Sequence, residues 1–265
     1  FLNVFFEGIT LLGEETLIIF LVVALWFAVD KKLAQQVFFV TATSLSLNGI
    51  IKNFAQVPRP FTKGISCVRP DTATGYAFPS GHTQVASTTY LGLAKTAKRV
   101  WVSILFALLT LLVAFSRMYL GVHTPLDVLV SLGIGLFFVF ALYPILDKAF
   151  TNHLGMLALF AFCTLFGLAN LLFVELYAFP ADVDLANLLN AKETAWKLLA
   201  AILGMLAAYL LDHYLVHFEV KAVWWVQMIK IALGVGSFML LRILLKQPCN
   251  ALLGEAAGGG LRYFL

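Results

Sequence analysis

Long apolar blocks without a charged residue run through most of this chain. The clearest are residues 33–51, 100–116, 128–146 and 154–174, each close to the ~20 residues that a helix needs to cross a bilayer. Only 12% of the 265 residues are charged, against roughly 25% in a soluble domain. Membrane β-strands alternate apolar and polar residues instead of forming unbroken blocks. The sequence therefore predicts an all-α, polytopic integral membrane bundle, and it excludes a soluble enzyme or a nucleic-acid-binding domain.

Four further segments complete a count of eight predicted spans. Residues 80–97 are less apolar than the others, and we expect a helix buried among them. The apolar tail 251–265 contains three consecutive glycines and leaves open a ninth span that is cut short. The four segments are 9–29, 80–97, 195–216 and 223–245.

Two longer polar segments, 52–79 and 175–194, separate the spans and fall on one side of the membrane. The short turns on the other side carry seven basic residues. The long-loop side carries six, Arg69 among them, besides three that we assign below to chemistry. Because basic residues favour the cytoplasmic side, we expect the short turns inside the cell and the long loops outside. This predicts a bacterial cytoplasmic membrane protein with its polar clusters facing the extracytoplasmic side.

Three polar clusters lie at predicted span ends on that same face. The first is Lys52 followed, after six residues, by Arg59-Pro60; the second is Pro79-Ser80-Gly81-His82; the third contains Arg117, His123 and Asp127. Arginine offers a planar fork for oxyanions, and lysine offers a compact positive charge. Ser80 and Gly81 stand where a helix should begin, with free backbone N–H groups. Lys52, Arg59, Arg117, Ser80 and Gly81 therefore form a candidate phosphate-binding site.

The two histidines of these clusters supply the candidate chemistry. His123 precedes a predicted helix start at Thr124-Pro125, so Asp127 can turn back, accept the Nδ1 proton and leave Nε2 free as a nucleophile. His82 is the candidate proton donor to a leaving oxygen. Neither a carboxylate pair nor a Cys/His set indicates a metal, so the sequence predicts no metal and no cofactor, with the cations stabilising the transition state.

The three clusters together resemble the signature of the type 2 phosphatidic acid phosphatase superfamily, which includes bacterial lipid phosphate phosphatases, glucose-6-phosphatase and the vanadium haloperoxidases. The pattern is Lys–six residues–Arg-Pro, then Pro-Ser-Gly-His, then Ser-Arg–five residues–His–three residues–Asp, and every position is present between 52 and 127. The resemblance implies that His123 becomes a phosphohistidine, that Asp127 supports it and that His82 protonates the leaving group. It also implies vanadate sensitivity and no metal requirement.

We therefore expect residues 1–150 to form a phosphatase membrane core and residues 151–265 to add transmembrane helices of unknown role. The expected reaction is hydrolysis of a lipid phosphate or lipid pyrophosphate. We expect the protein to contact membrane lipid and not to bind nucleic acid. The sequence leaves the oligomeric state open. One alternative keeps the site but takes a soluble phosphomonoester such as glucose 6-phosphate. A second is a transporter or lipid-binding membrane protein that uses the site without hydrolysis. A vanadate-dependent peroxidase is a weaker alternative, because the known members are soluble.

Overall fold

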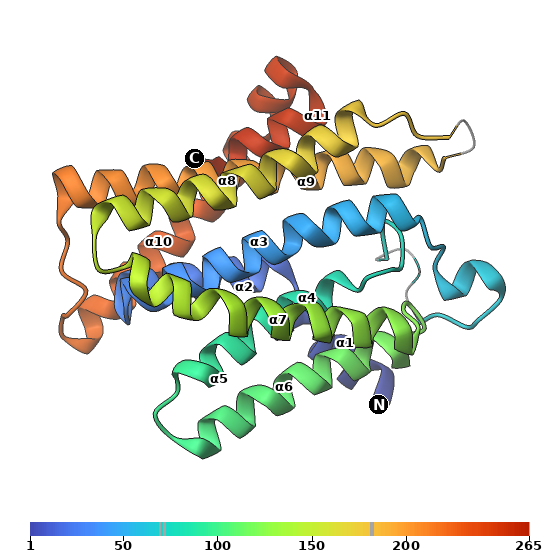
Figure 1. The fold of residues 1–265 in the computed structure, drawn as a ribbon, viewed down its shortest axis with the longest axis horizontal. Helices are drawn as coiled ribbons and strands as arrows, with labels where there is room; N and C mark the ends of the chain where they lie inside the picture. Colours follow the sequence, from blue (N-terminus) through green and yellow to red (C-terminus); the bar gives the residue numbers. More distant parts are fainter. Residues whose placement is uncertain (69, 71–72, 181–182, 265) are drawn as a thin grey trace. The chain divides into compact units, whose positions relative to one another are not determined.

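The described part of the chain folds into a set of helices, in a computed structural model (Figure 1). The description covers residues 1–68, 70, 73–180 and 183–264, so Arg69 of the charge count lies outside it. Over these residues no β-strand is present, which confirms the all-α prediction. The helices are α1 (Leu2–Leu11), α2 (Glu15–Ala28), α3 (Lys31–Ala55), α4 (Gly81–Ala86), α5 (Gly92–Thr96), α6 (Val100–Tyr119), α7 (Pro125–Ala149), α8 (His153–Leu176), α9 (Leu185–Leu211), α10 (Trp224–Leu244) and α11 (Lys246–Phe264).

Five helices of the described ranges are long and apolar enough to cross a membrane: α6, α7, α8, α9 with the π-helical turn that extends it to Val216, and α10. The pair α1 and α2, bent by 48° between them, gives a sixth if it is counted as one span. These helices fit an integral membrane bundle. The predicted count of eight is not reached by this criterion.

Two predicted spans, 33–51 and 80–97, are not apolar or long enough to meet this criterion. They are the most polar of the predicted spans. The first lies within α3, and the second corresponds to α4, a π-helical turn (Ser87–Leu91) and α5. Asn48 Nδ2 of α3 donates to Gln84 Oε1 of α4 at 2.7 Å, and Gln84 Nε2 donates to the Ser44 carbonyl at 2.8 Å. All three side chains are buried. Low hydropathy here reflects polar groups that satisfy one another inside the protein.

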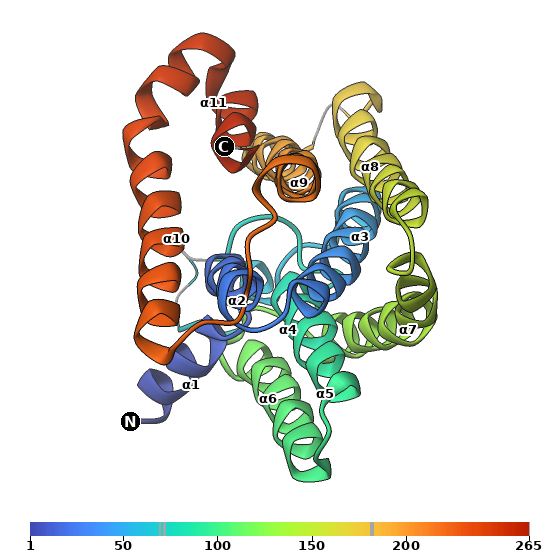
Figure 2. The ribbon, with the colours of Figure 1, turned by 90° about the vertical axis from the view of Figure 1, so that its left-hand side faces the viewer.

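The chain divides into two compact units. The first comprises Phe1–Ile19 and Gln36–Lys148, and it contains all three polar clusters. Within it α4 and α5 pack against α6, and α1 packs against the same helix. Figure 2 shows α5 and α6 side by side.

The second unit comprises Phe20–Gln35 and Ala149–Leu265. Its helices α8 and α9 lie side by side (Figure 1) around a small core of Leu171, Val174, Ala195 and Leu199. Residues 251–264 of the predicted apolar tail are part of α11, which packs on α9 and is broken at Gly254, whose φ is 78°. Glycine tolerates this left-handed backbone without steric cost.

Candidate active site

Ser80 begins the helix that carries His82. Its hydroxyl accepts the Thr83 backbone N–H at 3.4 Å, as an N-cap does. Its own N–H donates to the Asp127 carbonyl at 3.3 Å, so the second polar cluster is joined directly to the third. A Cβ at Gly81 would meet no atom within 4 Å, and the space beside this glycine is therefore open.

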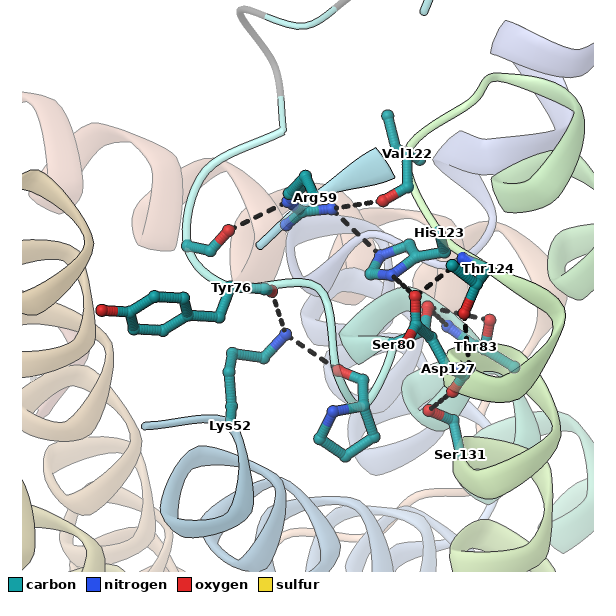
Figure 3. A network of polar contacts seen from close by, with 12 residues as sticks. Lys52, Arg59, Tyr76, Ser80, Thr83, Val122, His123, Thr124, Asp127 and Ser131 are labelled. Atoms are coloured by element: carbon teal, nitrogen blue, oxygen red, sulfur yellow. Dashed lines mark hydrogen bonds and ion pairs between the residues drawn. The ribbon is translucent and has the colours of Figure 1, made fainter. Parts of the chain in front are cut away.

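His123 sits between a carboxylate and a guanidinium (Figure 3). Its Nδ1 lies 3.5 Å from Asp127 Oδ2, and its Nε2 lies 3.1 Å from Arg59 Nη1. Arginine can only donate, so Nε2 must accept with its lone pair. We therefore assign the imidazole proton to Nδ1, facing Asp127, which leaves the Nε2 lone pair directed toward the cations.

Arg59 is held mainly by backbone oxygens. Nε donates to the Gly75 carbonyl at 2.9 Å, Nη1 donates to the Val122 carbonyl at 3.2 Å, and Nη2 donates to the Thr74 carbonyl. Gly75 has a φ of 73°, which a glycine adopts readily, and this turn presents its carbonyl to the guanidinium. These contacts fix the direction of the Arg59 fork toward His123.

Lys52 reaches the same region from the last turn of α3. Its Nζ donates to the Tyr76 carbonyl at 3.0 Å and to the Pro79 carbonyl at 2.8 Å. An ammonium group has three donors, and these two bonds leave one for a further acceptor. Lys52 and Arg59 both donate to carbonyls of the loop of residues 74–79 that leads to Ser80 (Figure 3).

Arg117 and His82 line one cavity of about 270 Å³, together with residues of α1 and the start of α2. Arg117 Nη1 donates to Thr10 Oγ1 at 2.7 Å. The Nε atom of Arg117 is buried and has no hydrogen-bond partner over the described ranges. A buried donor without a partner is costly, so Arg117 is prepared to receive an acceptor.

Burial sets the protonation states of His123 and Arg59, which lie outside the membrane-spanning helices. Burial, together with the nearby cations Arg59, Lys52 and Arg117, lowers the pKa of His123 to about 3, although the neighbouring Asp127 carboxylate opposes this shift. Burial also lowers the pKa of Arg59 to about 10, with Asp127 opposing the change. At neutral pH the site therefore contains an uncharged imidazole beside a charged guanidinium.

The comparisons with known proteins agree with this geometry. A family model of the PAP2 superfamily matches residues 33–151, and one described as the PAP2 superfamily phosphatase, transmembrane extension, matches residues 196–265. Phosphatidylglycerophosphatase B of Bacillus subtilis is 32% identical over 160 residues, which cover 52% of this chain and 73% of that protein. The chain belongs to the PAP2 superfamily. This confirms the resemblance identified from the three polar clusters.

Other PAP2 relatives match over shorter stretches. The undecaprenyl-diphosphatase of Sulfolobus acidocaldarius is 45% identical over 56 residues, covering 21% of this chain and 27% of that protein. The dolichyldiphosphatase of Saccharomyces cerevisiae is 30% identical over 121 residues, covering 42% of this chain and 51% of that protein. The chain thus spans about half or less of these two proteins. No solved structure matches it.

Some parts of the PAP2 site could not be identified from residue types. The oxygens that hold Lys52 and Arg59 belong to the backbone, which no side-chain pattern reveals. Thr10, the partner of Arg117, is a single hydroxyl in an apolar stretch and gives no signal. Glu14, between α1 and α2, also lines the cavity with His82. Among the described residues, no three His, Cys, Asp or Glu side chains gather as a metal site.

Proposed function

We propose that this chain is an integral membrane phosphatase that hydrolyses a lipid phosphate or lipid pyrophosphate. One observation carries the proposal: the buried His123 has its Nε2 lone pair among cations and its Nδ1 beside Asp127. The printed names of the relatives, two diphosphatases of polyprenyl lipids and a phosphatidylglycerophosphatase, support a substrate whose phosphate is attached to a lipid.

In the proposed reaction His123 Nε2 attacks phosphorus and forms a P–N bond while the bond from phosphorus to the leaving oxygen breaks. His82, in its protonated form, gives its proton to that oxygen. Water then attacks phosphorus as His82 takes its proton, a P–O bond forms, the P–N bond to His123 breaks, and inorganic phosphate leaves. Asp127 holds the Nδ1 proton and stabilises the positive charge that develops on the imidazole.

The phosphate oxygens would be held by Lys52, Arg59, Arg117 and the backbone at Ser80 and Gly81. Arg59 Nη1 lies 3.1 Å from His123 Nε2 and would transfer its hydrogen bond to a phosphate oxygen on binding. Positive charge placed in advance around the phosphorus stabilises the transition state without a metal. The proposed enzyme therefore needs no divalent cation.

We further propose a location in a bacterial cytoplasmic membrane with the site facing the extracytoplasmic side. The seven basic residues of the short turns, against six on the long-loop side outside the site, favour this orientation. Residues 1–150 would form the catalytic core and residues 151–265 the added helices. A lipid tail would enter from the bilayer, while its headgroup lies at the interface.

The test is phosphate release by the purified full chain in detergent from phosphatidic acid, phosphatidylglycerol phosphate, farnesyl diphosphate and glucose 6-phosphate. We expect release from the lipids, inhibition by vanadate, no effect of EDTA and complete loss in His123→Ala. His217→Ala is the matched control, because His217 is exposed and lies in the other unit.

Three results would contradict the proposal. Faster turnover of glucose 6-phosphate than of every lipid favours the soluble-substrate alternative. Binding of a lipid phosphate that survives His123→Ala, without phosphate release by the unmodified protein, favours a transporter or lipid-binding protein. A strict requirement for an added divalent metal contradicts the metal-independent reaction.

A further inference from the structure

The bend between α1 and α2 is fixed against the helix that carries His82. A Cβ at Gly13 would lie 2.9 Å from the His82 carbonyl oxygen and 2.8 Å from Val113 Cγ1, so only glycine allows this approach. Tyr90, on the same helical stretch as His82, donates its hydroxyl to the Leu12 carbonyl at 2.7 Å. We call residues 12–14 the elbow. Its position relative to His82 is set by packing on one side and a hydrogen bond on the other.

The elbow and the helix ends beside it form one wall of the cavity that His82 and Arg117 line. This wall carries two hydroxyls and three carboxylates: Thr10, Thr16, Glu7, Glu14 and Glu15. All of these residues precede residue 33, where the match to the PAP2 superfamily begins. The wall is therefore contributed by a part of the chain that the family match does not cover.

The position of the leaving oxygen decides which part of the substrate contacts this wall. In the proposed mechanism the leaving oxygen faces His82, because His82 gives it a proton. The chemical group attached to that oxygen then lies on the His82 side of the phosphorus, where the cavity continues to Glu14 and Thr10. The transferred phosphate stays with the cations Lys52, Arg59 and Arg117, of which Arg117 also lines this cavity and donates to Thr10.

Apart from Arg117, which we assign to the transferred phosphate, the charged residues of this lining are three carboxylates, and a carboxylate wall has the wrong charge for a second phosphate. Glu14 is half-buried in the cavity lining, where its carboxylate is less screened than on an open surface. A carboxylate accepts hydrogen bonds from hydroxyl or ammonium groups and repels an anion. A diphosphate would place its second phosphate, still bound to the lipid, against this wall. A monophosphate of an amino alcohol or polyol would place donors there.

We propose that the elbow forms the leaving-group subsite of this enzyme, and that Glu14 makes it select monophosphates whose headgroups carry hydroxyl or ammonium groups over diphosphates. The proposal rests on the function proposed above, because it takes His82 as the proton donor. It narrows the substrate class from any lipid phosphate to a hydroxyl- or ammonium-bearing monophosphate ester. Such selection depends as much on repelling the wrong group as on binding the right one.

The test compares kcat/KM for sphingosine 1-phosphate and farnesyl diphosphate, using the full chain in one detergent. We expect the unmodified protein to prefer sphingosine 1-phosphate, and Glu14→Gln, which keeps the shape and removes the charge, to shift the ratio toward the diphosphate by about tenfold. Glu219→Gln is the matched control, because Glu219 is exposed and lies in the second unit; its ratio should not change.

A second measurement needs no variant. Added salt screens charges that solvent reaches. Raising NaCl should therefore lower the ratio of kcat/KM for sphingosine 1-phosphate to kcat/KM for farnesyl diphosphate in the unmodified protein. The same ratio should stay nearly constant in Glu14→Gln. A preference for the diphosphate in the unmodified protein, or the same ratio with and without the Glu14 charge, overturns the proposal. Absence of phosphate release from both substrates contradicts the proposed function itself, and the subsite with it.

Discussion

His123 Nδ1 lies 3.5 Å from Asp127 Oδ2, with the two side chains only 1% and 2% exposed. The same carboxylate oxygen accepts the Thr124 backbone N–H at 2.7 Å, and the Thr124 hydroxyl accepts the Asp127 N–H at 3.3 Å. This reciprocal pair begins α7, so the start of the helix fixes the carboxylate before any substrate is bound. The imidazole is thereby held by a group that is itself held by the backbone.

Asp127→Asn should reduce kcat by about 10- to 150-fold, because a charge-assisted hydrogen bond is worth about 1.5–3 kcal/mol. The loss should be smaller than in His123→Ala, since Asp127 orients the nucleophile and does not form the bond to phosphorus. Steady-state phosphate release from one lipid phosphate measures both variants. An equal loss in the two variants would contradict this division of roles.

Arg59→Lys should lower kcat/KM by about 10- to 150-fold although it keeps the positive charge. Lysine cannot reproduce the planar fork that contacts the Thr74, Gly75 and Val122 carbonyls and His123 Nε2 together. The control is Lys63→Gln, which changes an exposed cation in the next turn of the same loop. Activity of Arg59→Lys equal to that of the control would show that charge alone is sufficient at this position.

The polar clusters could be predicted because the sequence shows directly the types of their side chains and the spacing between them. Lys52, Arg59, Ser80 and His123 could be assigned to one region from span ends alone, and the structure places them together. What holds them could not be predicted, because a backbone carbonyl such as that of Gly75 has no side-chain signature. The number of spans could not be predicted from charge-free segments, because a charge-free helix can still be polar. Buried polar pairs such as Asn48–Gln84 reduce the apolar character of α3.

Replacing Gly135 of α7 tests the close packing of helices near the site. A Cβ there would overlap the side chain of Ser87, which is fully buried in the π-helical turn after α4. Gly135→Ala should therefore destabilise the protein by about 1–3 kcal/mol, seen as a lower apparent unfolding temperature in detergent. Gly133→Ala is a control on the same helix, because its Cβ would meet nothing within 4 Å. Equal stability of the two variants would contradict the packing described here.

The depressed pKa of His123 also predicts how stability depends on pH. Burial lowers this pKa from 6.5 to about 3, so on acidification from pH 6.5 the unfolded chain takes up a proton that the folded chain refuses. The folded state should therefore lose stability as pH falls through this window. The apparent unfolding temperature, followed by tryptophan fluorescence in detergent from pH 7 to pH 4, should fall less steeply in His123→Gln than in the unmodified protein. His217→Gln, at an exposed position, should keep the original slope. The same acid dependence in all three proteins would show that His123 is protonated more easily than its burial implies.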